Sequence, residues 1–220
     1  IVYKACSTNE DYLTEEDWLY WQNKLDNISA ILIGPGIGKH SSTINMVFKI
    51  VSECKLPLIL DADAINAFEN KIEEFKKIYK GKSLILTPHP GEMARILNTN
   101  TTKVQSDRVK ILEKALEQLP ENSVIVLKGA GTLIGQSNKP IHINLTGNPG
   151  LAKGGSGDVL AGLLAGIVAS GIPAFEASCA AVFIHGLASD IAAYQSSEIS
   201  FSMMDVVNNI SSAFKNITLR

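Results

Sequence analysis

The chain has 220 residues, of which 45% are hydrophobic and 19% charged, so it can bury a sizeable core and lacks the composition of a disordered protein. Its 20 basic and 22 acidic side chains give a formal net charge of −2, which excludes the basic excess of a typical nucleic-acid-binding protein. Its three cysteines are far apart and form no Cys-x-x-Cys pair, which disfavours a disulfide framework or a zinc site and favours the reducing cytoplasm.

The first third of the chain alternates short apolar runs with helical segments. Residues 1–5 predict a strand, and because a chain rarely starts inside a strand, we expect the sequence to begin partway through a longer protein. Residues 14–24 predict a helix with a capping threonine and three acidic side chains in its first turn, where the helix dipole favours anions. Strands at 30–33 and 58–60 are expected to flank an amphipathic helix at 42–54.

The rest of the chain continues this alternation and then changes character. Strands are expected at 83–87 and 124–127, with a helix at 104–119 between them. Continuous apolar strands between helices predict a mostly parallel sheet with helices on both faces. The last third predicts a hairpin of 131–134 and 141–145, a glycine-rich loop at 147–157, and helices at 158–170, 174–194 and 202–214.

The longest uncharged stretch, residues 159–175, contains three glycines and a proline. It is shorter than the roughly 20 residues of a membrane span, so it predicts a buried helix and the turn after it. The start of the chain also lacks the basic and apolar segments of a signal peptide. We see no internal repeat, low-complexity tract or linker, and we therefore expect one domain over residues 1–220.

Every unusual loop in the sequence follows one of the apolar strands. These loops are a Gly-Pro-Gly-Ile-Gly turn at 34–38, an Asp-Ala-Asp turn at 61–63, and the segments 87–92 and 128–132. A single glycine-rich turn is usually no more than a tight connection. Four such loops are more informative, because ligands of an open parallel sheet bind beyond the carboxyl ends of its strands.

The strongest feature is the glycine-rich loop 147–157 together with Asp158, which follows it. Glycines let backbone N–H groups approach an anion, and the start of the next helix adds its dipole, so phosphate or developing negative charge would be stabilised here. Asp158 could be a base that takes the proton of a hydroxyl group during phosphoryl transfer, or it could be the cap of the helix. The spacing alone leaves both roles open.

Neither glycine loop has the pattern of a common nucleotide-binding motif. The loop 147–157 does not close with Gly-Lys-Ser/Thr, which disfavours a P-loop NTPase. The turn 34–38 contains a proline and has the wrong spacing for a dinucleotide fingerprint, which disfavours an NAD-dependent dehydrogenase.

The residues around Asp158 carry a family resemblance. The segment Gly-Gly-Ser-Gly-Asp at 154–158 resembles the Gly-x-Gly-Asp signature of ribokinase-like small-molecule kinases, in which the aspartate is the catalytic base. A more specific resemblance, to the NAD(P)H-hydrate dehydratases that repair damaged nicotinamide cofactors, rests on 34–38, 61–66, 87–93 and 148–150. The motifs occur in the same order from Ile33 to about Asp205, and the Pro-His-Pro-Gly-Glu form is similar to the bacterial type, which uses ADP.

This resemblance implies a ribokinase-like three-layer α/β fold and an ADP-dependent lyase acting on hydrated NADH and NADPH (NADHX and NADPHX). ADP (or ATP), with Mg²⁺, would supply a phosphoryl group to the hydroxyl of the hydrated ring, and phosphate would then leave. Asp158 is the implied base, and no residue is assigned as a metal ligand. The implied substrate contacts are Gly36, Gly38, His89 and Asp158, and the implied nucleotide contacts are Lys128, Gly129, Ala130, Gly131, Thr132, Asn148, Gly155 and Gly157.

Some residues of these motifs also have a purely structural interpretation. His89 could be a backbone-bonded residue of a rigid turn between two prolines, although the motif favours a ligand contact. Asp61 and Asp63 could hold Asn66 and the neighbouring loops, or a metal-bound water, and the structural role is favoured.

Three features of the last third are expected to serve structure or charge. Lys153 could steer anions toward the loop or be solvated. The small residues of the helix at 158–170, among them Gly162 and Gly166, are expected to let it approach the sheet closely. His185 is expected to be packed or capping rather than a ligand.

Two other functions stay open at this point. A vitamin-precursor kinase for hydroxyethylthiazole or a pyridoxine-like alcohol would share Asp158, but the 87–93 motif disfavours it. A non-catalytic nucleotide-binding subunit would have no use for the base. The resemblance also implies a further N-terminal strand–helix segment in the family, so we expect a domain that lacks this segment, from a parent protein that is a homo-oligomer such as a tetramer.

Overall fold

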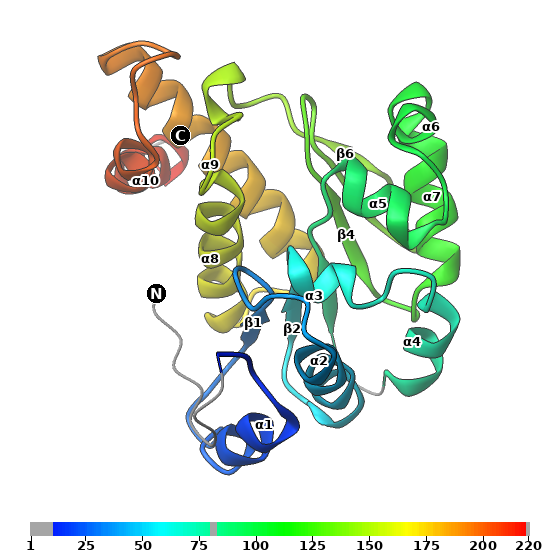
Figure 1. Cartoon of the computed structure of the whole chain (residues 1–220). Helices are drawn as coiled ribbons and strands as arrows, with labels where there is room; N and C mark the ends of the chain where they lie inside the picture. Colours follow the sequence, from blue (N-terminus) through cyan, green and yellow to red (C-terminus); the bar gives the residue numbers. More distant parts are fainter. Residues whose placement is uncertain (1–10, 80–82, 219–220) are drawn as a thin grey trace.

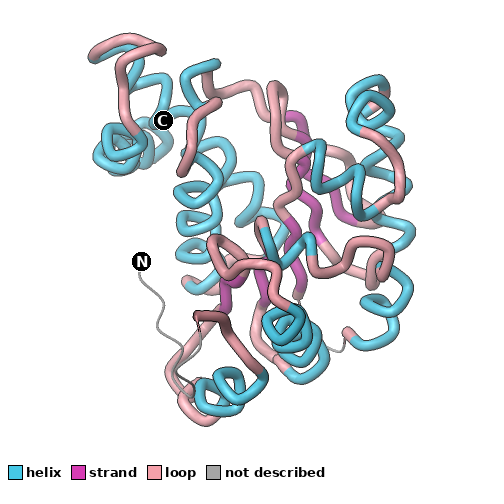
Figure 2. The backbone as a smooth tube through the Cα atoms, in the orientation of Figure 1, coloured by secondary structure: helices cyan, strands magenta, loops and turns pink. Residues whose placement is uncertain are grey.

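A computed structural model describes residues 11–79 and 83–218 of the chain. The strand expected at 1–5 and Cys6 lie outside the described residues. Within them the molecule has three layers, with a sheet between two groups of helices (Figures 1 and 2). The expectation of an α/β fold with helices on both faces of a mostly parallel sheet is confirmed.

The central layer is a six-stranded sheet whose strands lie side by side in chain order. The first four strands are parallel and the last two are antiparallel to their neighbours, which confirms the expected hairpin. The strands are β1 (Ile31–Ile33), β2 (Leu58–Leu60), β3 (Leu84–Leu86), β4 (Val124–Leu127), β5 (Leu133–Gln136) and β6 (His142–Ile143).

Two groups of helices cover the two faces of this sheet. One face carries α1 (Glu15–Gln22), α2 (Ser41–Glu53), α3 (Asp63–Asn66), α4 (Ile72–Ile78), α5 (Pro90–Ile96), α6 (Thr101–Ser106) and α7 (Arg108–Gln118). The other face carries α8 (Ser156–Ala169), α9 (Ala174–Gln195) and α10 (Met203–Thr218), with a 3-10 turn at Pro149–Leu151 leading into α8. Figure 1 shows α8 and α9 on the opposite side of the sheet from α5 and α7.

Alternation along the buried strands divides the core between these two faces. In β2, Leu58 and Leu60 pack with the α2–α7 group, whereas Ile59 packs with α8 and α9. Leu86 and Ile85 of β3 divide in the same way. Each such side chain that is fully buried stabilises the fold by about 1.5–3 kcal/mol, which explains why the central strands are apolar at every position.

The prediction of one helix at 104–119 is wrong, because two helices, α6 and α7, occupy this part of the chain. The chain breaks at Asp107, whose backbone is not helical (φ −152°, ψ 77°), and the Asp107 carboxylate accepts a hydrogen bond of 3.1 Å from the N–H of Lys110. This contact starts α7, while Asn100 caps α6 in the same way. The short helices α3, α4 and α5 were also not expected.

The packing expected of α8 is only partly confirmed. Leu160, Leu164 and Ile167 are buried against the sheet. Gly162 and Gly166 do not face it: a Cβ built on either would have no described atom within 4 Å apart from the helix's own backbone. The close approach expected from these two glycines is therefore wrong.

The long helix α9 has the length and apolar composition of a membrane span. Of its most apolar 18-residue window, 56% is buried inside the described fold, as in the core helix of a soluble protein. Its apolarity is thus accounted for by packing on α8, α10 and the sheet.

Candidate active site

The loops that follow β1 and β2 meet at the carboxyl edge of the sheet. Gly34 has a φ of +134°, and a Cβ on it would lie 1.6 Å from the Asp61 carbonyl oxygen, so only glycine allows this approach. The backbone N–H of Gly38 donates to the Asp63 carboxylate at 3.1 Å. Asp63 therefore holds the 34–38 loop, and this part of the structural interpretation of Asp63 is confirmed.

Gly36 and Gly38 both have positive φ, yet a Cβ on either would meet no described atom within 4 Å. Their requirement for glycine is thus one of backbone conformation and not of contact with the fold. The N–H groups of Ile37 and Gly38 are already bonded within the protein, so Gly36 is the glycine of this turn whose N–H stays open to a ligand.

Asp61 joins the ends of three strands. Its carboxylate is 2% exposed and accepts hydrogen bonds of 2.7 Å from the Thr87 hydroxyl and of 2.7 Å from the Lys128 ammonium group. The Glu92 carboxylate lies 3.9 Å from the same ammonium group. The result is a nearly buried cation held between two carboxylates, an arrangement in which loss of one partner leaves a costly unpaired charge.

His89 forms the cap of α5. Its Nδ1 accepts from the N–H groups of Gly91 at 2.9 Å and Glu92 at 3.3 Å, while the Glu92 carboxylate accepts from the His89 N–H at 2.7 Å and lies 3.3 Å from Nε2. Burial, helped by the charges of Lys128 and Arg95, lowers the pKa of His89 below its usual value, against the opposing effect of Glu92. The rigid backbone-bonded turn is confirmed, and the half-exposed ring is still available to a ligand.

The start of α8 lies beside this cluster. A Cβ on Gly157 would lie 3.5 Å from the Lys128 Nζ and 3.9 Å from Asp61 Oδ2, so the glycine-rich loop and the ends of β2 and β4 form one region. The helix begins at Ser156 after Gly155, whose φ is +86°. Asp158 is therefore the third residue of the helix and not its cap.

The Asp158 carboxylate is exposed and has no hydrogen-bond or ion-pair partner among the described residues. A carboxylate in the first turn of a helix is favoured by the helix dipole, but no hydrogen bond or ion pair within the described part of the chain occupies this one. It is well placed to accept a proton from a bound hydroxyl group.

The remaining sequence-predicted residues are held by contacts to more distant elements. The turn 128–132 is bound by Arg108 of α7, which donates to the carbonyl of Leu127 at 2.8 Å and to that of Lys128 at 3.2 Å. Asn148 is bound by α9: its amide donates to Asp190 at 2.9 Å and to Ser189 at 3.2 Å. The structure shows no described contact between Asn148 and the cluster around Lys128.

Lys153 is held by contacts within the protein. Its ammonium group donates to the carbonyl of Phe201 at 2.6 Å and to those of Glu198 and Ile199 at 3.2 Å, and it lies over the Phe201 ring. Lys153 thus ties the glycine-rich loop to the segment before α10 and is not merely solvated, while its role in steering anions stays a prediction.

Three supporting residues were missed from the sequence: Glu92, Arg108 and Asp190. The position of Glu92, three residues after a capping residue, is the spacing of a capping box and could have been noticed. Arg108 and Asp190 act across 19 to 43 residues of sequence, and no local pattern marks them.

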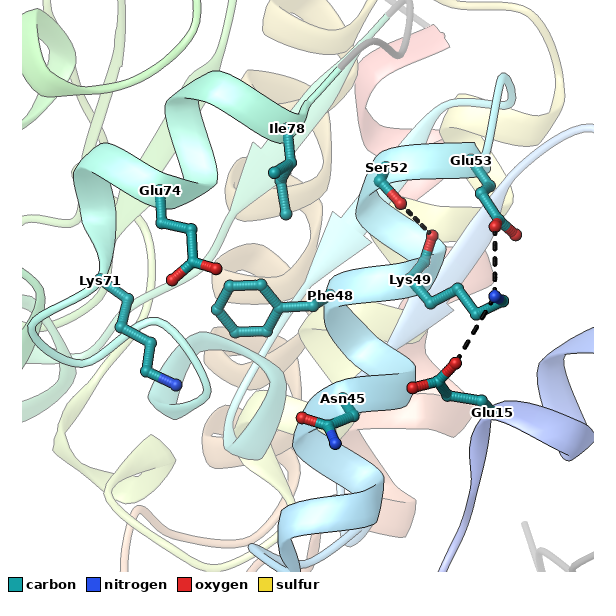
Figure 3. A pocket seen from close by; sticks show the side chains of 9 residues that line it. All are labelled: Glu15, Asn45, Phe48, Lys49, Ser52, Glu53, Lys71, Glu74 and Ile78. Atoms are coloured by element: carbon teal, nitrogen blue, oxygen red, sulfur yellow. Dashed lines mark hydrogen bonds and ion pairs between the residues drawn. The ribbon is translucent and has the colours of Figure 1, made fainter.

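A cavity of about 380 Å³ lies elsewhere, between α1, α2 and α4 (Figure 3). Its walls include Phe48 and an ion-pair chain in which Lys49 lies 3.5 Å from Glu15 and 3.4 Å from Glu53. Its lining on α2 runs from Asn45 to Glu53, the last residue of that helix. None of the motif residues lines it.

A metal ion would find few protein ligands here. Over residues 11–79 and 83–218, no three side chains of His, Cys, Asp or Glu form a group that could hold one. This donor set fits a cation such as Mg²⁺ only where bound phosphate oxygens and water supply most of its ligands, with Asp158 as the free carboxylate nearby.

The comparisons with known proteins agree with one another. A family model described as NAD(P)H-hydrate dehydratase matches residues 4–211. The ADP-dependent (S)-NAD(P)H-hydrate dehydratase of Neisseria meningitidis is 39% identical over 169 residues, which are 76% of this chain and 56% of that protein. The bifunctional NAD(P)H-hydrate repair enzyme Nnr of Moorella thermoacetica is 35% identical over 196 residues, 88% of this chain and 36% of that protein.

Solved structures give the same result. The ADP/ATP-dependent NAD(P)H-hydrate dehydratase of Bacillus subtilis, co-crystallized with ATP and Mg²⁺, has a TM-score of 0.74 and 30% identity, over 89% of this chain and 69% of that one. A hydroxyethylthiazole kinase from Pyrococcus horikoshii, at 18% identity and a TM-score of 0.65 over 91% and 76% of the two chains, shares the fold alone. The expected ribokinase-like fold is confirmed, and the vitamin-kinase alternative is the more distant one.

Proposed function

Because this chain belongs to the NAD(P)H-hydrate dehydratase family, we propose that its activity is the ADP-dependent dehydration of hydrated NADH and NADPH (NADHX and NADPHX). The reaction makes it a carbon–oxygen lyase in nicotinamide-cofactor repair. ADP transfers its terminal phosphoryl group to the ring hydroxyl, leaving AMP. Elimination of phosphate with a ring proton then restores the double bond.

The observation that carries this proposal is the free carboxylate of Asp158 beside the glycine-rich start of α8. We assign Asp158 as the base that accepts the hydroxyl proton when the oxygen attacks phosphorus. The N–H groups of Gly155 and Gly157 are directed to the transferring phosphoryl group, where fixed donors stabilise the developing charge. A nucleotide-binding subunit without catalysis would have no use for such an unpaired carboxylate.

The two ligands occupy different parts of the edge in this proposal. The nucleotide side consists of the turn after β4 and the glycine-rich loop, with the residues Lys128, Gly129, Ala130, Gly131, Thr132, Asn148, Gly155 and Gly157. The substrate side consists of Gly36, Gly38, His89 and Asp158. Support comes from Asp61 and Glu92, which link His89 and Lys128 through described contacts, and from Asp63, which binds the 34–38 loop.

Mg²⁺ accompanies the nucleotide in this proposal, as in the Bacillus subtilis enzyme co-crystallized with ATP and Mg²⁺. The ion would neutralise charge on the phosphate oxygens when bound. The described residues favour a nucleotide-held ion over a protein cage, since Asp158 is the carboxylate left free at this edge.

The wider setting of the protein belongs to the same proposal. We place it in the cytoplasm as one ribokinase-like domain of a homo-oligomer such as a tetramer, with no nucleic acid or membrane as partner. The formal charge of −2 and the burial of α9 support the last two points. The chain spans 56% of the length of the Neisseria meningitidis relative and 36% of that of the Moorella thermoacetica relative. The activity of those whole proteins therefore comes to this chain only as a proposal.

The proposed activity is tested by incubating the protein with hydrated NADH and either ADP or ATP and following the return of reduced-nicotinamide absorbance. We expect absorbance to return with at least one nucleotide, together with release of phosphate. No return with either nucleotide, alongside phosphorylation of hydroxyethylthiazole or a pyridoxine alcohol, would replace the dehydratase with the kinase.

The role of Asp158 is tested by Asp158→Asn, which keeps the size of the side chain and removes its basicity. Turnover should fall by at least about 100-fold, the usual contribution of a positioned base, while the Kd of ADP stays within about threefold of wild type. The matched control is Asp26→Asn, an exposed aspartate in the loop before β1, which should leave both quantities unchanged. Turnover that survives in Asp158→Asn would show that the base is another group.

A further inference from the structure

Arg108, the first residue of α7, reaches across to the turn that follows β4. Its Nη2 donates to the carbonyls of Leu127 at 2.8 Å and Lys128 at 3.2 Å, and its Nη1 donates to Gly131 at 3.2 Å and also to Ala130. One guanidinium group therefore binds four carbonyls within a segment of five residues.

These contacts set the path of the turn. Carbonyl groups that converge on one point repel one another unless a donor lies between them, and a planar group with five N–H donors fits this need better than a single ammonium. The fifth carbonyl, that of Gly129, accepts from the Thr132 hydroxyl at 2.9 Å. The carbonyls of 127–131 are thus all directed toward donors within the protein.

Gly129 shows that the turn and the guanidinium group fit closely. Its φ is +138°, and a Cβ on it would lie 3.3 Å from the Arg108 Nη2. A side chain at this position would strain the backbone and press against the guanidinium group. The glycine and the arginine are therefore two parts of one arrangement.

The same arrangement restrains Lys128 at its carbonyl. The backbone N–H of Lys128 donates to the Pro88 carbonyl at 2.8 Å, and its ammonium group donates to Asp61 at 2.7 Å. Arg108 supplies the remaining contact, at the carbonyl oxygen. Its loss would release the backbone on one side of the cation that lies next to Gly157.

We propose that Arg108 is a positioning residue for the nucleotide: it holds the turn 128–131 in the shape that binds ADP, without touching the reacting atoms. The inference rests on the proposed function in one respect, namely that this turn is part of the nucleotide side of the site. Carbonyls bound by Arg108 cannot face the anionic phosphates. The N–H of Lys128 is used by the Pro88 carbonyl, so the N–H groups of residues 129–131 are the ones left for the ligand.

The test compares Arg108→Ala, Arg108→Lys and wild type by ADP titration calorimetry and by steady-state kinetics. We expect the Kd and KM of ADP to rise about tenfold or more in Arg108→Ala, the loss typical of hydrogen bonds to a charged group. The kcat at saturating ADP and the KM of hydrated NADH should stay within about threefold. Arg108→Lys should be intermediate, and guanidinium ion at a non-denaturing concentration should restore part of the ADP affinity of Arg108→Ala.

The matched control is Lys110→Ala, on the same turn of α7, where the exposed ammonium group lies 3.0 Å from the Asp107 carboxylate. It should leave ADP binding unchanged. An ADP affinity in Arg108→Ala within twofold of wild type would overturn the inference. A fall in kcat together with an equal rise in both KM values, without rescue by guanidinium, would also overturn it, because that result would indicate general damage to the fold.

The outcome also separates this inference from the proposed function. If wild type binds ADP through Arg108 but does not dehydrate hydrated NADH, the proposed reaction fails and the role of Arg108 stands. If wild type dehydrates its substrate and Arg108→Ala is neutral, only the role of Arg108 fails. If wild type binds neither ADP nor ATP, both are wrong.

Discussion

At the residue scale, Asp158 shows how far a sequence motif can go. The segment 154–158 was sufficient to single out this aspartate, but not to choose between a cap and a free base. That choice depends on where the helix starts, because the observed cap, Gly155, lies three residues before Asp158. Gly155, in a left-handed conformation, starts α8 without a side-chain cap, so the Asp158 carboxylate interacts with the helix dipole but caps no N–H group.

His185 is a second residue whose expected role as a packed histidine is confirmed. It lies on α9, is 6% exposed, and its Nε2 has no hydrogen-bond partner among the described residues. Burial lowers the pKa of His185 from 6.5 to about 4. The folded protein therefore holds this ring neutral at a pH where the unfolded chain protonates it.

Loss of stability in acid follows from this shift. The stabilisation from the neutral ring is complete above the unfolded pKa of 6.5 and is lost as the pH falls toward 4, by about 3 kcal/mol at pH 4. His185→Leu, which cannot titrate, should lose that much less free energy of unfolding than wild type between pH 7 and pH 4, as measured by urea unfolding.

The pKa of His89 is lowered as well, and it contributes in the same direction in both proteins, so the comparison isolates His185. Equal losses in wild type and His185→Leu would show that His185 is protonated in the folded state or that it is solvated.

At the element scale, every strand expected within the described residues was found. The central strands β2, β3 and β4 are apolar throughout because they are buried on both faces. The exposed strand β6 was found as part of the expected hairpin. The short helices α3 and α5 were not, because a helix of four to seven residues gives too few turns for a periodic pattern. The break between α6 and α7 was missed for a related reason. An aspartate inside a helical pattern is as compatible with an exposed helix position as with a cap.

Helix α8 was located correctly but its glycines were misinterpreted. Gly162 and Gly166 lie on the outer side of the helix, whereas the glycine of α9 at 186 is buried against the chain: a Cβ there would lie 2.2 Å from the Thr146 hydroxyl and 2.6 Å from its carbonyl carbon. Composition alone cannot distinguish a glycine that permits contact from one that merely lacks a side chain.

Two matched substitutions separate these cases. Gly162→Ala should raise the free energy of unfolding by about 0.5–1 kcal/mol, because alanine restricts the unfolded chain and favours the helix. Gly186→Ala should lower it by more than about 2 kcal/mol, because the segment at 146 must move. Urea unfolding at pH 7 measures both, and a destabilised Gly162→Ala would show that this side of α8 is covered.

At the scale of the whole molecule, the carboxyl edge of the sheet was predictable but its construction was not. The order of strands and loops along the sequence places four loops together in any parallel sheet. The contacts that hold them come from segments far away in the sequence, such as Asp61 with Lys128 and Asn148 with Asp190. Such pairs become visible only when the layers are in place.

The location of the site is tested by two lysine substitutions. Lys49→Ala, in the cavity between α1 and α2, should leave the Kd of ADP within about twofold of wild type, since it alters surface ion pairs alone. Lys128→Met is combined with Asp61→Asn so that the Asp61 carboxylate is not left buried and unpaired. This double variant should raise the Kd of ADP by about tenfold or more. The opposite pattern in titration calorimetry would move the nucleotide to the cavity in Figure 3.

The strand order of the sheet has a consequence for how the protein is made. Each strand from β2 to β6 pairs with the strand that precedes it in the chain. During synthesis, each of these strands therefore meets a partner that is already present when it emerges from the ribosome. Among the six described strands, none has to be inserted between two strands that were made earlier. The sheet can grow in one direction, from β1 toward β6, at the pace of translation.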